Sequence, residues 1–298
     1  MRAPKLRALC ALLLATAALA ACSTAAKPLP LPLPLPLPLP LPLPPPLPLP
    51  PPLTLRQPVV LLGEVHDNAA QHALRGAAFE ALLARGARPV LAMEQFDRDK
   101  QPAIDRLLAQ TPRPDAEALI AAAGGPGWHW PHYRPFISAA LAHGLPIVAA
   151  NVGRDEARRV MREGLAASGF TASVPAALLA QQAQGIEASH CGMLDAATAG
   201  RMALAQVARD QFMASVLQAH APRGVVLLAG NGHVRTDIGA PHWLTPEVRA
   251  RSEAIGVLEE GDALQAFDSR VFTPVQARPD PCEKMRRTVP GPAPELRR

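Results

Sequence analysis

The sequence predicts an α/β domain, and three observations lead to this fold class. Four short apolar runs are continuous rather than alternating, which is typical of parallel strands buried on both faces. Stretches with helical spacing separate these runs, as crossovers between parallel strands require. About 220 residues remain between the compositionally unusual ends of the 298-residue chain, which is ample for one large core.

The predicted elements alternate along the chain. The clearest strands are residues 59–62, 89–93, 146–150 and 225–229, with two more expected near 254–258 and 263–271. Helical spacing with few breakers covers residues 69–85, 133–143, 155–167 and 196–220. The last two helical stretches fall between the third and fourth strands. We therefore expect a mostly parallel sheet flanked by helices, with a helical insertion between its third and fourth core strands.

The first 22 residues have the features of a bacterial export signal. Three basic residues precede an apolar run that is too short for a comfortable membrane span. Residues 19–22, Leu-Ala-Ala-Cys, resemble the lipobox, whose cysteine is lipidated after cleavage. We expect a signal peptide over 1–21 and durable lipid anchoring at Cys22, with an ordinary cleaved signal as the alternative. The serine after Cys22 points, by resemblance to sorting rules, to the outer membrane.

Residues 28–52 are almost entirely proline and leucine. A proline at every second position lacks an amide proton and fixes φ, which excludes a helix or a central strand. The segment should form extended polyproline II, which at roughly 3.1 Å per residue would reach about 75 Å. Residues 22–55 are therefore interpreted as a lipidated stalk, with a ligand for an aromatic groove as the alternative. The domain is expected over 56–275 and a basic, disordered tail over 276–298.

The positive charge of the chain is concentrated at its ends. The whole chain has 30 basic and 25 acidic residues, but the stretch from 56 to 277 has 20 basic and 22 acidic ones. This near-neutral core predicts no nucleic-acid partner, because such binding needs basic residues gathered on one folded face. Cys191 and Cys282 are the only cysteines beyond the lipobox, so one disulfide is possible in an oxidising envelope.

Polar side chains follow each of the four clearest strands. Glu64 and His66 follow the first strand, Glu94 the second, Asn151 the third and His233 the fourth. In open parallel sheets, ligands bind in the crevice at the carboxyl ends of the strands. Glu64 and His66 are two residues apart, so they project to the same side of an extended backbone. Two carboxylates and two imidazoles are therefore expected to converge on one ligand.

Each of these residues also has a purely structural interpretation. Glu64 could cap the following helix, although Asp67 and Asn68 already form a good cap signal. A single histidine at a strand end, such as His66 or His233, is often a hydrogen-bonded scaffold group. Glu94 is harder to explain in this way, because a buried carboxylate needs a partner.

Seven segments that include these residues together resemble a known family. They are Gly-Glu-Val-His-Asp-Asn (63–68), Met-Glu-Gln-Phe (93–96), Tyr-Arg-Pro (133–135), Leu-Pro-Ile-Val-Ala-Ala-Asn (145–151), His-Cys-Gly-Met-Leu (190–194), Arg-Asp (209–210) and Ala-Gly-Asn-Gly-His-Val (229–234). In this order the set is similar to ChaN-type haem-binding uptake lipoproteins, within the wider Tiki, TraB and erythromycin-esterase-like group. The resemblance implies an α/β domain that binds haem at the cell envelope for iron acquisition. Relatives in the wider group use the first and last of these segments as metal-site or hydrolytic elements.

The segment 124–136 is the best candidate for haem contact by composition. It holds four of the eleven aromatic residues, including the single tyrosine, Tyr133, so any tyrosinate ligand of haem iron must be that residue. His129 and His132 are plausible ligands, and Arg134 could meet a propionate. The alternative is that these aromatic residues pack the start of the following helix.

The segment 190–193, His-Cys-Gly-Met, is a second candidate. A ligand role for His190 or Met193 is possible, but a catalytic thiol is disfavoured because neighbouring residues on one chain seldom orient each other's reactive atoms. The sequence contains neither a P-loop nor a Gly-x-Ser-x-Gly nucleophile motif. It also lacks Cys-x-x-Cys-His, so bound haem would be noncovalent.

These patterns support three hypotheses of different classes. The first is a lipid-anchored envelope protein that binds haem for uptake, with an outer-membrane haem receptor and a homodimer as possible partners. The second is a metal-dependent hydrolase in which a divalent ion is held by four side chains: Glu64, His66, Glu94 and His233. The third is a noncatalytic envelope scaffold.

Overall fold

The computed structural model describes residues 53–263, 265–280 and 282–283. The expected signal peptide, the lipid attachment site at Cys22 and nearly all of the Leu-Pro stalk lie outside the described residues, as does most of the basic tail. Within the described residues, no helix has the length and apolar character needed to cross a membrane.

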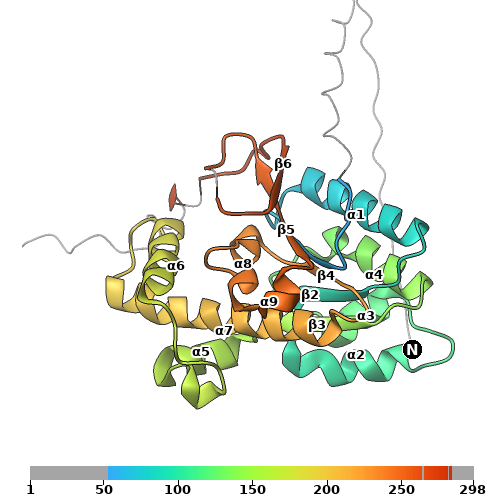
Figure 1. Ribbon diagram of the computed structural model, residues 1–298, viewed down its shortest axis with the longest axis horizontal. Helices are drawn as coiled ribbons and strands as arrows, with labels where there is room; N and C mark the ends of the chain where they lie inside the picture. The colour runs from blue at the N-terminus through green and yellow to red at the C-terminus, as the bar shows by residue number, and fades with distance from the viewer. Residues whose placement is uncertain (1–52, 264, 281, 284–298) are drawn as a thin grey trace, which may run out of the picture. The chain divides into compact units, whose positions relative to one another are not determined.

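A six-stranded sheet forms the centre of the domain, and every neighbouring pair of strands in it is parallel (Figure 1). The order across the sheet is β3 (Ile147–Asn151), β2 (Val90–Asp97), β4 (Val225–Leu228), β1 (Val59–Leu62), β5 (Ser252–Glu259) and β6 (Ser269–Thr273). The predicted fold class is thus confirmed. β2 continues past its predicted end, so Glu94 lies within the strand rather than after it.

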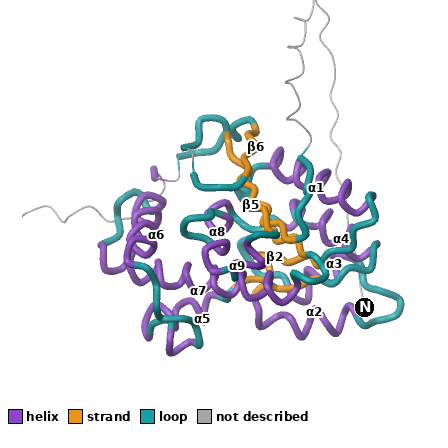
Figure 2. Tube along the Cα trace, viewed as in Figure 1, coloured by secondary structure: helices purple, strands orange, loops and turns teal. Residues whose placement is uncertain are grey.

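Helices cover both faces of this sheet (Figure 2). Because side chains alternate along β1, Val60 and Leu62 pack with one set of helices, whereas Val59 and Leu61 pack on the other face. The first face carries α1 (Ala69–Ala84), α2 (Gln101–Leu108), α3 (Ala116–Ala123) and α4 (Arg134–Ala142). The second face is covered mainly by α7 (Ala196–His220). The continuous apolar runs in the sequence are the result of this two-sided burial.

The predicted helical insertion between β3 and β4 is present. It consists of α5 (Arg154–Glu163), α6 (Ala176–Ser189) and α7, which lie together at one side of the domain (Figure 1). Two one-turn helices, α8 (Asn231–Val234) and α9 (Pro246–Arg249), follow β4.

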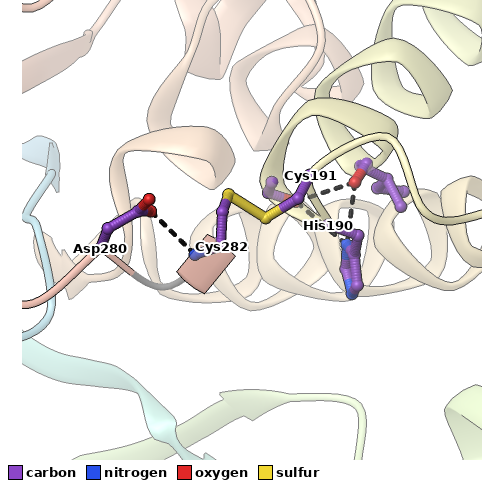
Figure 3. The surroundings of a disulfide bond; sticks show 6 residues. His190, Cys191, Asp280 and Cys282 are labelled. Carbon is purple, nitrogen blue, oxygen red and sulfur yellow. Dashed lines mark hydrogen bonds between the residues drawn. A yellow bond between two sulfur atoms is a disulfide. The ribbon is translucent and has the colours of Figure 1, made fainter. Parts of the chain in front are cut away.

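The chain after β6 folds back onto the domain. We call residues 274–283, of which 281 is not described, the C-terminal strap. Cys282 in this strap forms a disulfide with Cys191 at the end of α6, 91 residues away in the sequence (Figure 3). The one disulfide that the cysteine count allowed is thus formed. Gln276 and Arg278 are hydrogen-bonded to the domain, in a region where the sequence indicated a disordered tail.

Candidate functional site

Glycine at position 63 allows the chain to leave β1 between two neighbouring elements. The Gly63 amide donates a hydrogen bond to the Ile255 carbonyl at 2.8 Å, and a Cβ on residue 63 would lie only 2.9 Å from that oxygen. Asn231 approaches from the β4 side. A larger residue would push β1 away from β5, and glycine therefore fixes where Glu64 enters the site.

Glu64 is the centre of a buried polar group, which we call the interior cluster: Glu64, His72, Arg75 and Tyr133. The Glu64 carboxylate forms an ion pair with Arg75 and accepts a hydrogen bond from the Tyr133 hydroxyl at 2.5 Å. Burial lowers the pKa of Arg75 to about 9, which leaves it charged at neutral pH. The helix cap is instead Asn68, whose side chain accepts from the Gln71 amide at 3.1 Å, so the capping interpretation of Glu64 is wrong.

Tyr133 belongs to this interior rather than to the surface. Its side chain has no exposed area, and burial raises the pKa of its hydroxyl above the usual value. The neutral hydroxyl that donates to Glu64 is therefore the stable form. In this arrangement Tyr133 could reach haem iron only after the loop that carries it had moved.

A second chain of polar contacts runs from Glu94 to Asp210. Glu94 accepts a hydrogen bond from the Gly230 amide at 2.7 Å, and one of its oxygens lies 3.5 Å from His233 Nε2. On the other side of the ring, His233 Nδ1 contacts the fully buried Asp210 at 2.6 Å. Burial raises the pKa of Asp210 to about 6. Burial by itself would lower the pKa of His233, but the nearby carboxylates of Asp210 and Glu94 have the larger combined effect and raise that pKa. The pair of His233 and Asp210 can therefore hold a proton or transfer one.

His66 lines two depressions, each of about 670 Å³. Both fall within the usual range of ligand sites. The first, which we call the α6 cavity, is bordered by α6 and includes His233. The second, the histidine depression, is lined by His66, Trp128, His129, His132, Gln276 and neighbouring loop residues. The His66 side chain is 49% exposed, and its Nδ1 lies 2.8 Å from Glu64. His66 thus connects the interior cluster to both depressions.

The imidazoles of the histidine depression are suited to ligate a metal centre. His132 stacks on His72 at 4.2 Å between ring centroids, and His129 approaches it edge-on at 4.4 Å. Burial, together with these two neighbours, lowers the pKa of His132 to about 4. His132 therefore stays neutral at physiological pH and keeps the nitrogen lone pair that a metal requires. With the Trp128 ring beside it, this donor set fits a flat, apolar, iron-containing group such as haem.

Three predicted site residues lie away from these depressions. Arg134 is exposed at the start of α4 and pairs with Glu117 at 3.1 Å. Asn151 donates to Asp97 at 2.8 Å at the end of β3. His190, at the end of α6, contacts the Ile186 carbonyl at 2.8 Å beside the disulfide (Figure 3). Their roles as ligand contacts remain predictions.

The hypothesis of a divalent metal site receives no support from this geometry. The structure does bring its four residues, Glu64, His66, Glu94 and His233, to one edge of the sheet. Among the residues that the structure describes, however, no group of three or more His, Cys, Asp or Glu side chains is arranged to hold a metal ion. The reason is local: Glu64 is occupied by Arg75 and Tyr133, and Glu94 by the Gly230 amide.

Three important residues were not among the candidate site residues from the sequence, although Asp210 belongs to the Arg-Asp segment (209–210) that contributes to the family resemblance. His72 and Arg75 come from α1, and Asp210 comes from α7. Each is buried on a helix face that otherwise packs apolar side chains. The sequence did contain a signal for these residues: each is polar at a position where helical periodicity calls for an apolar side chain.

Comparisons with known proteins agree with the observed fold. A family model described as "Haem-binding uptake, Tiki superfamily, ChaN" matches residues 54–244. The structure titled "Cofacial heme binding to ChaN of Campylobacter jejuni" is similar at 21% identity and a TM-score of 0.59, covering 72% of this chain and 87% of that one. At this identity the likeness supports the fold.

More distant likenesses extend to other classes of protein. The type III effector HopBA1 is similar at 14% identity and a TM-score of 0.42, with 74% of this chain and 88% of that one covered. A mutant of the erythromycin esterase EreC gives 14% and 0.36, with 69% and 71% covered. At such TM-scores these likenesses carry no functional weight. No functionally curated protein matches the chain. Because the family model spans well over half of its length, the chain belongs to the ChaN family of haem-binding uptake proteins in the Tiki superfamily.

Proposed function

We propose that this protein binds haem noncovalently in the histidine depression. The observation that carries this proposal is an open depression with one aromatic wall, Trp128, and three imidazoles, at the carboxyl edge of a ChaN-family sheet. His129 and His132 are the proposed ligands of the iron. His66 is proposed to contact the macrocycle as well, because it borders the same depression.

We further propose that the protein serves haem or iron uptake at the bacterial cell envelope. The support is the sequence of residues 1–52: an export signal, a lipobox cysteine at Cys22 and an extended Leu-Pro stalk. In this proposal the lipid holds the chain in the outer membrane and the stalk keeps the haem domain away from it. An outer-membrane haem receptor and a second copy of the chain are the proposed partners.

Haemin titration of the full-length protein in detergent tests the haem site. Wild-type protein should develop a saturable Soret band. His129→Ala and His132→Ala should shift that band or weaken binding, because each removes a proposed iron ligand. His143→Ala is the matched control, since His143 is an exposed histidine at the end of α4 and should leave the spectrum unchanged.

Tyr133→Phe separates this proposal from a tyrosinate ligand. The substitution removes only the hydroxyl, which donates a hydrogen bond to Glu64. If histidine ligates the iron, the Soret position should be that of the wild type. A shifted band in Tyr133→Phe together with unchanged spectra in both histidine variants would assign the ligand to Tyr133. Absence of saturable binding in wild-type protein would refute haem binding altogether and leave the scaffold hypothesis.

A further inference from the structure

The C-terminal strap is attached to the loop that carries His66. Gln276 makes two hydrogen bonds there: it accepts from the Ala69 amide at 2.9 Å and donates to the Asp67 carbonyl at 2.5 Å. Asn68 donates to the Pro274 carbonyl at 3.2 Å. The strap therefore holds the residues immediately after His66, and Gln276 itself lines the histidine depression.

Arg278 strengthens this attachment by bridging two carboxylates. Its guanidinium donates to both oxygens of Asp67 at 2.9 Å and to both oxygens of Glu259 at 2.7 and 2.8 Å. Asn68 also donates to Glu259, at 2.7 Å. The end of β5, the strap and the start of α1 thus form one connected network. Planar, bidentate pairing of this kind fixes direction as well as distance.

Beyond Arg278, the strap reaches α6, which lines the α6 cavity and not the histidine depression. Cys282 is bonded there to Cys191, directly after α6 (Figure 3). α6 forms one wall of the α6 cavity, yet only Leu178 and Ile186 of this helix are buried. A helix with so little buried apolar surface has a low free energy of local opening. The disulfide joins this weakly packed wall to the firmly bonded part of the strap.

We propose that the C-terminal strap is a clamp that joins the loop of His66, which borders the histidine depression, to α6, which borders the neighbouring α6 cavity. Through Gln276 and Arg278 it holds the loop of His66, and through the Cys191–Cys282 disulfide it holds α6 over the neighbouring cavity. Arg278 and the two cysteines are therefore positioning residues. The inference rests on the proposed function only in taking haem as the ligand.

Hydrogen exchange of the ligand-free protein tests the clamp without haem. The full-length chain is used in detergent. Cys10 and Cys22 are replaced by serine in every protein compared, so that the Cys191–Cys282 pair is the only cysteine difference between them. The double variant Cys191→Ser plus Cys282→Ser should exchange roughly tenfold faster in α6. Arg278→Gln, which keeps the disulfide, should accelerate exchange in residues 64–72. Arg270→Gln is the matched control, because Arg270 is exposed on β6 and, among the described residues, its side chain donates only to the Gln265 carbonyl.

Haemin dissociation provides the functional measurement. Transfer of haemin to a large excess of an external haem acceptor should be roughly five- to tenfold faster from both clamp variants than from Arg270→Gln, because each variant releases one attachment of the strap whose Gln276 lines the histidine depression. A strap with a merely structural role would lower the urea midpoint of unfolding and leave this native-state rate unchanged. If hydrogen exchange accelerated in the clamp variants while their haemin release stayed at the control rate, the clamp would be overturned. It would also be overturned if both variants exchanged at the rate of the wild-type protein.

Failure of the clamp can be distinguished from failure of the proposed function. If the wild-type protein takes up no haemin, haem binding is wrong, and exchange within 64–72 and α6 then decides the clamp alone. If wild-type protein binds haemin while both clamp variants exchange and release it as the wild type does, haem binding stands and the clamp is wrong.

Discussion

The carboxyl edge of the sheet carries two polar regions that differ in their access to solvent. In the interior cluster, Glu64, Arg75 and Tyr133 are bonded to one another and fully buried. In the histidine depression, His66 and His129 are exposed to solvent. The interior groups are closed off from solvent, whereas imidazoles beside an open space can contact a ligand. The interior cluster is therefore the support of the site, and the depression is its binding surface.

The sharpest way to break this comparison is to remove the charge partner of Glu64. Arg75→Met leaves a buried carboxylate without its cation, which should lower the free energy of unfolding by about 3–5 kcal/mol. Urea denaturation followed by far-UV circular dichroism measures this loss. Adding Glu64→Gln to Arg75→Met should restore part of the stability, because the double variant leaves no unpaired charge.

Arg134→Gln is the matched control for this prediction. It breaks the pair between Arg134 and Glu117, whose side chains are 56% and 63% exposed. An exposed pair contributes about 0–1 kcal/mol. If Arg75→Met cost no more than Arg134→Gln, the interior cluster would not be the support of the site.

The elements that sequence reasoning predicted well are those buried on both sides. β1 and α7 match their predicted limits, because the apolar pattern of each reflects contacts along its whole length. α6 gave no comparable signal, since its positions are largely alanine and glutamine; α5 also buries only two residues but was predicted, because charged side chains separate its apolar positions. Short α2 and α3 were also missed. Helical periodicity is thus visible where apolar and charged positions contrast along an element, as in α5, and not where small or polar residues fill most positions, as in α6.

The candidate site was predictable only in part. Chain order placed Glu64, Glu94 and His233 at strand ends, and parallel topology then brought them to one edge. Composition made Tyr133 a candidate ligand of haem iron, but its burial depends on the approach of Arg75 and His72 from α1. That approach is set by helix packing over the sheet, which strand patterns do not encode.

A smaller effect is expected where the two regions meet. A Cβ at position 230 would lie 2.8 Å from the His66 ring and 3.7 Å from a Glu94 oxygen. Gly230→Ala should therefore displace His66, at about 1–3 kcal/mol of unfolding free energy, and should also weaken haemin binding. Gly232→Ala is the matched control in the same turn, because a Cβ there meets no atom within 4 Å and its φ is not positive. Equal haemin affinity in the two variants would show that the position of His66 does not matter for binding.

The smallest expected effect is a pH dependence that distinguishes the C-terminal strap from the interior cluster. Hydrogen bonds from Arg278 lower the pKa of Glu259 from 4.5 to about 2. Because the folded value is the lower one, this tie contributes fully above pH 4.5 and is lost as the pH falls from 4.5 toward 2. Hydrogen exchange of residues 64–72, corrected for intrinsic rates, should therefore accelerate over this interval, and Glu259→Gln should remove the dependence. The interior contacts of Glu64 do not involve the strap, so Tyr133 should stay packed, as its near-UV circular dichroism would report, while the strap loosens. If acid accelerated exchange in residues 64–72 and abolished the near-UV signal over the same interval, the strap and the interior cluster would form one cooperative unit. The strap would then belong to the support of the site together with the interior cluster.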